Sequence, residues 1–315
     1  MNRGNENHQS NISLDSDFIN VKQLFLIIWQ SRILIAFAIF FSFSGSIYYS
    51  LNMNNVYKIE ATLAPADTFA KGGSTLSSQY SGLASFAGVS LPSSGSDRIA
   101  EGIEIIKSLD FFENFVNNYD LFLGIIASES WDSASNKILY DPKIYDIKQK
   151  KWLSDDRFSL NGKPSIQSAH RFFISNLGIS EDKKTGFINI SYKHYSPYFA
   201  KHLLDSIIIE INNIVRLKDI EISERSIEYL QQEQKKNTLS SLKTGINSLI
   251  QNEIESMTIA NSSPEYLFKV LSKPYVNEIK FAPNRFLIVI SLTLFGFMLS
   301  IILVLLRSFF KNSLL

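Results

Sequence analysis

The chain has 315 residues, a net charge of +1 and no cysteine. This length allows one or two domains with a buried core. The near-neutral charge and the lack of a dense Lys/Arg patch argue against nucleic-acid binding, and the missing cysteines exclude disulfides, thiolate metal sites and a cysteine nucleophile.

The first 32 residues have the character of a cytoplasmic tail. Residues 1–14 are polar and rich in asparagine, a composition typical of disorder. From Asp15 to Trp29, apolar residues recur at helical spacing, which predicts an amphipathic segment against the membrane surface. Lys22 and Arg32 precede an uncharged run, and this charge distribution favours a cytoplasmic N-terminus.

Two uncharged apolar runs, one near each end of the chain, are long enough to cross a bilayer. They are residues 33–51 and 286–306, and the hydrocarbon layer they must cross is roughly 30 Å thick. The first run is longer than the core of a signal peptide and ends in an aromatic pair, so we favour a retained membrane helix over a cleaved signal. Two spans place residues 52–285 in the periplasm and the tail 307–315 in the cytoplasm.

Residues 56–195 combine strand and helix patterns and predict an α/β base. Val56–Leu63 alternates and predicts a strand that Pro65 ends. The stretch from Asp67 to Asp97 is rich in serine and glycine, as a flexible loop is. Its apolar segment Leu83–Val89, which contains Phe86, suggests packing near the membrane or between subunits.

Further elements of the base follow from local periodicity. We expect helices over Asp97–Tyr119 and Ser165–Asn176, a turn at Asp141-Pro142, and two strands, Leu177–Ser180 and Gly186–Tyr192, around a polar turn.

A helical pattern then extends over residues 197–261. Pro197 suits a helix start, and a wide apolar stripe runs from Ala200 to Val215. The pattern predicts one very long, coiled-coil-like helix of roughly 90 Å if it is continuous. The stripe fades near Gln231–Asn237, where a break is the alternative. A proline-containing strap, residues 273–285, then leads into the second span, and the whole predicts an α+β membrane protein.

No motif in the sequence indicates an enzyme. The P-loop, His-Glu-x-x-His and Gly-x-Ser-x-Gly patterns are all missing. The four histidines, His8, His170, His194 and His202, lack metal-ligand spacing. The acidic and basic residues between Lys218 and Lys235 suit a solvated or subunit-facing stripe with i,i+4 pairs better than an acid/base pair. We therefore expect no catalytic residue, cofactor or metal.

The order of these features resembles the polysaccharide co-polymerases, the bacterial chain-length determinant (Wzz-type) proteins. The segments that carry the resemblance are Asp17–Leu24, Ile99–Phe115, Tyr266–Pro274 and Pro283-Asn284-Arg285, followed by Gly296 in the second span. The further proline that is usual in the family's strap is missing from Tyr275–Ala282. The P-loop kinase domain of some larger relatives is also absent.

The resemblance implies a non-enzymatic regulator that sets the modal length of lipopolysaccharide O-antigen as a ring-forming inner-membrane co-polymerase. The implied partners are other copies of the chain in an octamer-like ring, an integral-membrane glycan polymerase, the growing lipid-linked polysaccharide and membrane lipid. The alternative is an inner-membrane subunit of a capsule or exopolysaccharide export complex. A sensor would need a larger cytoplasmic module, and no motif supports a hydrolase or transferase.

We expect the functional residues to lie on surfaces rather than in a pocket. The candidates are Arg225, Glu228, Gln232 and Lys236 on the polar face of the long helix, Phe86 in the Ser/Gly-rich loop, and Pro274 and Pro283 in the strap.

Overall fold

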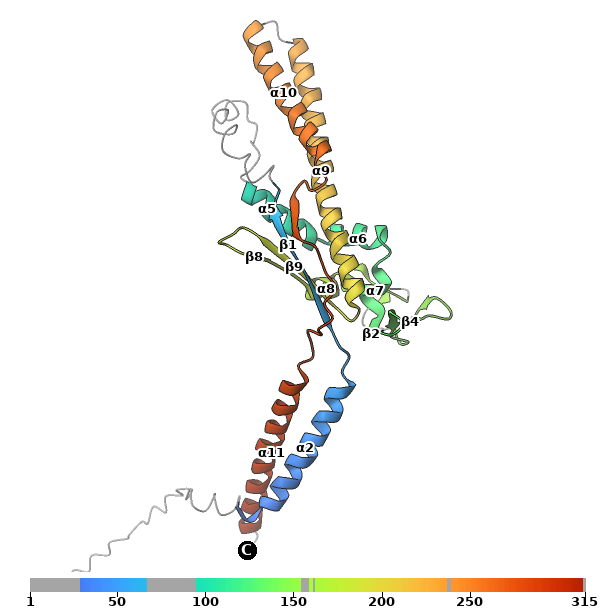
Figure 1. Cartoon of the computed structure of the whole chain (residues 1–315), viewed down its shortest axis with the longest axis vertical. Coiled ribbons are helices and arrows are strands. Elements are labelled where there is room, and N and C mark those ends of the chain that lie inside the picture. Colours follow the sequence, from blue (N-terminus) through green and yellow to red (C-terminus); the bar gives the residue numbers. More distant parts are fainter. Residues whose placement is uncertain (1–28, 67–94, 154–158, 161, 237–238, 314–315) are drawn as a thin grey trace, which may run out of the picture. The chain divides into compact units, whose positions relative to one another are not determined.

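The computed structural model of the chain describes residues 29–66, 95–153, 159–160, 162–236 and 239–313 (Figure 1). These residues form two compact units. The helical-pair unit comprises the described parts of residues 1–53 and 283–315, and the sheet unit comprises Asn54–Ala282. Apart from Trp29, the amphipathic segment expected near the N-terminus lies outside the described residues, as does the loop segment with Phe86.

Two long apolar helices pack against each other in the helical-pair unit: α2 (Arg32–Asn52) and α11 (Arg285–Ser313). Both have the length and composition of a membrane-spanning helix, in agreement with the two predicted spans. Large side chains such as Phe40, Phe41 and Phe295 are exposed on them. An exposed apolar surface of this kind suits contact with lipid.

Close packing of α2 on α11 depends on Gly296. The Ser42 hydroxyl of α2 donates to the Leu292 carbonyl of α11 at 3.0 Å, and a Cβ at position 296 would lie 2.2 Å from Ser42 Oγ. Small residues allow membrane helices to approach in this way. We expect Gly296→Leu to weaken the pair by about 1–3 kcal/mol, because overpacking forces the helices apart.

Cross-linking measures this effect directly, because the chain has no native cysteine. Cysteines at Ala38 and Ser300, which line one groove between the helices, should be joined by a short bifunctional maleimide in the parent and much less in Gly296→Leu. Ala36→Leu is the control, since Ala36 is exposed on α2 and does not line this groove. Equal yields in all three proteins would contradict the expectation.

A four-stranded antiparallel sheet forms the centre of the sheet unit. Its strands, in spatial order, are β10 (Phe268–Ser272), β1 (Tyr57–Pro65), β9 (Ile188–His194) and β8 (Leu177–Glu181). Alternation along β1 and β9 places Ile59, Ala61, Leu63, Ile188, Ile190 and Tyr192 in the core. The predicted strands at 56–63, 177–180 and 186–192 are confirmed, with Pro65 as the last residue of β1.

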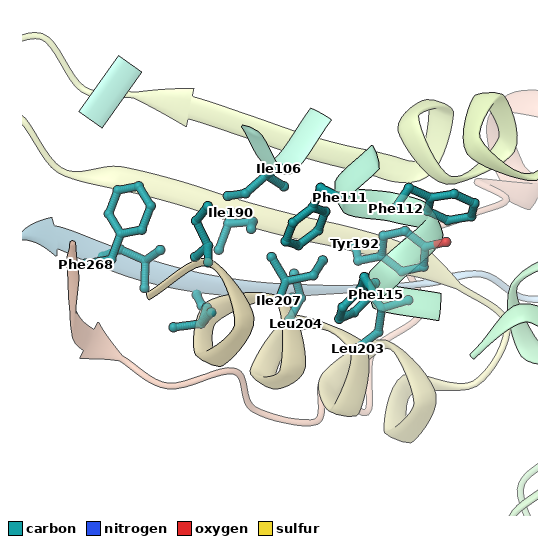
Figure 2. Packing of buried hydrophobic residues seen from close by; sticks show 14 of the residues in the cluster. Ile106, Phe111, Phe112, Phe115, Ile190, Tyr192, Leu203, Leu204, Ile207 and Phe268 are labelled. Carbon is teal, nitrogen blue, oxygen red and sulfur yellow. The ribbon is translucent and has the colours of Figure 1, made fainter. Parts of the chain in front are cut away.

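Helices cover one face of this sheet. They are the first half of α9 (Pro197–Lys236), α5 (Gly95–Lys107), α6 (Leu109–Asn118) and α8 (Ile166–Asn176). Figure 2 shows Phe112 and Phe115 of α6 with Tyr192 of β9 and Leu203 of α9 in one cluster. The rings of Phe112 and Phe173 lie 5.0 Å apart and those of Phe173 and Tyr192 lie 5.8 Å apart. This aromatic packing joins α6 and α8 to the sheet.

Short elements fill the connection between α6 and α8. They are α7 (Phe122–Ala127), β2 (Ser128–Asp132), β3 (Lys137–Tyr140), β4 (Tyr145–Asp146), β5 (Lys151–Trp152), β6 (Ser159–Leu160) and β7 (Lys163–Pro164). The strands pair as three two-stranded hairpins. The predicted turn at Asp141-Pro142 connects β3 to β4.

The helix expected over residues 97–119 is two helices, α5 and α6. Ser108 separates them in an extended conformation, and its hydroxyl accepts from the Phe111 N–H at 3.1 Å. A serine in this position caps a new helix start and so ends the previous helix. The break lets α6 turn its phenylalanines into the core.

The helix expected over residues 197–261 is likewise two helices, α9 of 40 residues and α10 (Ser240–Ser262). The alternative, a break near Gln231–Asn237, is confirmed, because α9 ends at Lys236. They pack as a hairpin (Figure 1), with the Gln234 amide donating to Asn247 Oδ1 at 2.6 Å. A continuous rod of roughly 90 Å could not return to β10, because residues 263–267 reach at most about 18 Å. The α+β fold class with one very long helix and two candidate membrane helices is confirmed.

Asn212 of α9 fastens β10 to the helix above it. Its Oδ1 accepts from the backbone N–H groups of Leu267 and Phe268 at 2.7 and 2.8 Å. Its amide donates to the Phe268 carbonyl at 3.1 Å and to the Ile208 carbonyl at 2.9 Å. All four groups lie in the buried part of the unit, so one side chain satisfies backbone polar groups that β10 would otherwise leave unpaired.

Candidate interaction surfaces

The four predicted polar candidates lie together on the outer half of α9. All of them are exposed: Arg225, Glu228, Gln232 and Lys236. Arg225 Nη1 lies 3.7 Å from Glu221 Oε1, Gln232 Nε2 donates to Glu228 Oε1 at 3.5 Å, and Lys236 Nζ lies 2.8 Å from Glu233 Oε1. The hydrogen bond that Lys236 donates to Glu233 raises the pKa of Lys236.

These contacts all join residues of one helix, three or four positions apart. Exposed pairs of this type contribute at most a few tenths of a kcal/mol each. These contacts are too weak to prevent the stripe from binding elsewhere, so its exposed charged groups remain accessible to another chain.

Large apolar side chains are also exposed on the α9–α10 hairpin. Tyr229 is 62% exposed, and the others are Leu217, Ile222, Leu239, Leu242, Leu249, Ile254 and Ile259. A shallow groove of about 570 Å³ lies between the helices, with Ile227 on the α9 side and Met257 on the α10 side. Grouped apolar side chains beside a polar stripe are typical of a protein-binding surface. The sequence alone did not indicate this feature, because the pairing of α9 with α10 decides which of their apolar side chains stay exposed.

A polar network fixes the base of the hairpin. Arg98 of α5 pairs with Asp219 of α9 and, at 3.1 Å, with Glu101. Lys218 Nζ lies 2.6 Å from Glu101, and the Tyr266 hydroxyl donates to Asp219 Oδ2 at 2.9 Å. The network joins α5, α9 and the chain leading into β10.

The electrostatics of this network match a structural role. The hydrogen bond from Lys218 lowers the pKa of Glu101, despite partial burial, and Arg98 adds to the effect. Burial and then the Asp219 charge raise the pKa of Tyr266. Burial opposes the charge on Arg98, but its bonds to Asp219 and Glu101 raise the pKa of the guanidinium overall. The shifts favour charged Arg98 and Glu101 and a neutral Tyr266, as expected of an ion-pair network that positions helices.

The strap contributes less surface than the sequence suggested. Pro274 is buried and Pro283 is half-buried. Near its end the strap pairs with the residue before β1: the Val56 N–H donates to the Ala282 carbonyl at 2.8 Å, and the Phe281 N–H donates to the Val56 carbonyl at 2.9 Å. The two strap prolines therefore shape the backbone of the strap and contribute little exposed surface.

Among the described side chains, no group of three or more His, Asp and Glu residues could hold a metal ion. His170 and His202 lie on different helices, α8 and α9, and His194 is buried on β9.

Comparison with known proteins finds a family match in the N-terminal part of the chain. Residues 17–119 match the family model described as "Wzz: Chain length determinant protein". This match confirms the resemblance to the chain length determinant family. No curated protein sequence matches the chain.

Solved structures with a similar arrangement are also distant in sequence. A full-length bacterial polysaccharide co-polymerase is 10% identical, with a TM-score of 0.38, over 93% of this chain and 99% of the other. A fragment of WzzB, a polysaccharide co-polymerase from Salmonella Typhimurium, is 10% identical, with a TM-score of 0.30, over 72% of this chain and 100% of the other.

Proposed function

We propose that this chain, which contains a chain length determinant domain, is a non-enzymatic regulator of polysaccharide chain length. Its substrate system would be lipopolysaccharide O-antigen, and its activity would be to set the modal length as an inner-membrane co-polymerase. The family match over residues 17–119 carries this proposal. Two candidate membrane helices, one before and one after the mixed α/β unit in the sequence, support it.

The proposed topology follows from the two spans. Both termini lie in the cytoplasm, and the sheet unit lies in the periplasm, because Lys22 and Arg32 precede the first span. In this topology the strap returns the chain from the sheet unit to the second span.

The proposed partners follow from the surfaces. Copies of the chain form a ring, in which the α9–α10 hairpins pack side by side through the exposed apolar residues and the polar stripe. Closed cyclic symmetry is the usual form of such assemblies. The integral-membrane glycan polymerase and the growing lipid-linked polysaccharide complete the system. An inner-membrane subunit of a capsule or exopolysaccharide export complex is the second candidate, since it needs the same two-span architecture.

Charge reversal on the polar stripe tests the proposed packing of hairpins. In the double variant Arg225→Glu and Lys236→Glu, each new carboxylate meets an acidic neighbour, Glu221 or Glu233. Within one subunit this costs less than about 1 kcal/mol. Between subunits the repulsion repeats around the ring, so the assembly should become smaller and the glycan modal length should shift.

The assembly is measured by light scattering on detergent-solubilised protein, and the glycan by gel electrophoresis. A matched control changes one arginine and one lysine that are exposed elsewhere, Arg171→Glu and Lys183→Glu, and should keep both properties. The proposed interface is excluded if the stripe variant also keeps both its mass and its modal length.

A further inference from the structure

Two lysines lie directly opposite each other on the open face of the sheet. Lys58 of β1 and Lys193 of β9 are register partners in the antiparallel ladder. Their chain neighbours Ile59 and Tyr192 point into the core, so the lysines point to the other face. Like charges directly opposite each other across two strands are destabilising. An anion bound beside both ammonium groups would relieve this repulsion, so the arrangement points to an anionic ligand.

An aromatic ring from the strap lies beside both ammonium groups. The Nζ atoms of Lys58 and Lys193 lie 5.6 and 5.2 Å from the ring centroid of Phe281, which is 52% exposed. Hydrogen bonds of Val56 with Phe281 and Ala282 hold this part of the strap in place. The result is a site in which two cations lie beside a partly exposed aromatic ring.

The charges around this site are unbalanced. Lys58 Nζ lies 2.5 Å from Glu60 Oε1, so its charge is partly compensated. Lys193 makes no ion pair with any acidic residue in the described part of the chain. One full positive charge is thus available to a ligand, and the second lysine can add to it.

The short connections between this site and the two candidate membrane spans indicate what kind of ligand it binds. Five residues, 53–57, separate Lys58 from the end of α2, and three residues, 282–284, separate Phe281 from the start of α11. Both connections lead to candidate membrane spans. Aromatic and basic side chains at such a level contact lipid headgroups.

We propose that Lys58, Lys193 and Phe281 form a binding site for the phosphate of an anionic membrane phospholipid. This inference rests on the membrane placement in the proposed function, and adds a ligand class and a site to it. The ammonium groups bind the phosphate oxygens, and the phenylalanine ring contacts the glycerol region of the same lipid. In the proposed topology Lys273, Lys280 and Arg285 lie on the periplasmic side of the second span. Basic residues usually gather on the cytoplasmic side of a span instead. Contact with anionic lipid at the periplasmic side would explain this exception.

Native mass spectrometry of the purified full chain tests the site. The protein is incubated with an equimolar mixture of phosphatidylglycerol and phosphatidylcholine, and the retained lipids are counted. We expect the parent to retain phosphatidylglycerol with a preference of roughly tenfold, and Lys58→Thr with Lys193→Thr to lose most of it. The variant should fold, because threonine suits a strand and the like-charge pair is removed.

The matched control is Lys183→Thr with Lys184→Thr, in the turn at the other end of β9, which should keep the preference. The proposal is overturned if the Lys58/Lys193 variant keeps it, or if the control loses it equally. It is also overturned if an excess of inorganic phosphate abolishes the preference, since the site would then bind free phosphate rather than lipid. No glycan or polymerase is present, so this result is independent of the O-antigen proposal.

Discussion

Replacing Asn212 with leucine should lower the free energy of unfolding of the sheet unit by about 3–5 kcal/mol. Leucine has a similar volume but cannot replace the bonds to the Leu267 N–H, the Phe268 N–H and the Phe268 carbonyl. Each buried polar group left without a partner costs about 1–3 kcal/mol. Because β10 also leads into the strap, its loosening should free the chain on the way to the second span.

The neighbouring residue provides the control for this prediction. Asn213 is half-buried, and its side chain accepts from Arg216 Nη2 at 3.3 Å. Asn213→Leu makes the same chemical change on the same helix and should change stability by less than about 1 kcal/mol. Denaturant titration, followed by the fluorescence of Trp131 and Trp152, reports the sheet unit. Equal stability losses in the two variants would show that Asn212 has no special role.

Lowering the pH from 7 to 4 should remove about 3 kcal/mol of stability through His194 alone. This side chain is buried; its Nε2–H donates to the Gly124 carbonyl at 3.0 Å, and its Nδ1 accepts from the Ser196 N–H at 3.0 Å. Burial lowers the pKa of His194 to about 4, although the nearby backbone carbonyls of Gly124 and Ser196 oppose the shift. In the unfolded chain a histidine pKa is about 6.5.

The direction follows from proton binding. Between pH 6.5 and 4 the unfolded chain binds a proton at His194 that the folded chain does not, so acid favours unfolding. The full stabilisation is present above pH 6.5 and falls progressively toward pH 4. His194→Gln, which cannot titrate, should be less stable at pH 7 but should lose about 3 kcal/mol less on acidification.

His202→Gln is the control for this pH dependence. His202 is exposed on α9, so its removal should leave the acid dependence as it is in the parent. Urea titrations at pH 7 and pH 4 on all three proteins give the comparison. An identical loss on acidification in the parent and in His194→Gln would contradict the buried neutral state of His194.

Strong local periodicity made the two spans, β1, β8, β9 and α8 predictable from the sequence. The two helix breaks follow different causes. Ser108 has a local signal, since a serine followed by apolar residues can cap a helix. The end of α9 at Lys236 had only a fading apolar stripe. The break has a non-local cause: the chain must turn back so that β10 can pair with β1. The sequence pattern within residues 197–261 contains no information about that pairing.

The candidate sites were predictable to a lesser degree. Charges at helical spacing identified the stripe of Arg225, Glu228, Gln232 and Lys236, which the structure places on one exposed helix. The Lys58–Lys193 pair was not predictable, because the residues are 135 positions apart and only the register of β1 with β9 brings them together. The contact between Asn212 and Phe268 was not predictable either, because these residues are also far apart in the sequence. The one sign in the sequence was a polar asparagine within the apolar stripe of the long helix.

The surface lipopolysaccharide ladder, compared on a gel with and without the gene, tests the central proposal most directly. Chain length regulation predicts that deletion removes a modal cluster of bands and leaves a distribution that decays smoothly with length, and that the parent gene restores the cluster. An unchanged ladder would contradict the O-antigen role. If capsule or exopolysaccharide changed instead, the export-complex alternative would take its place.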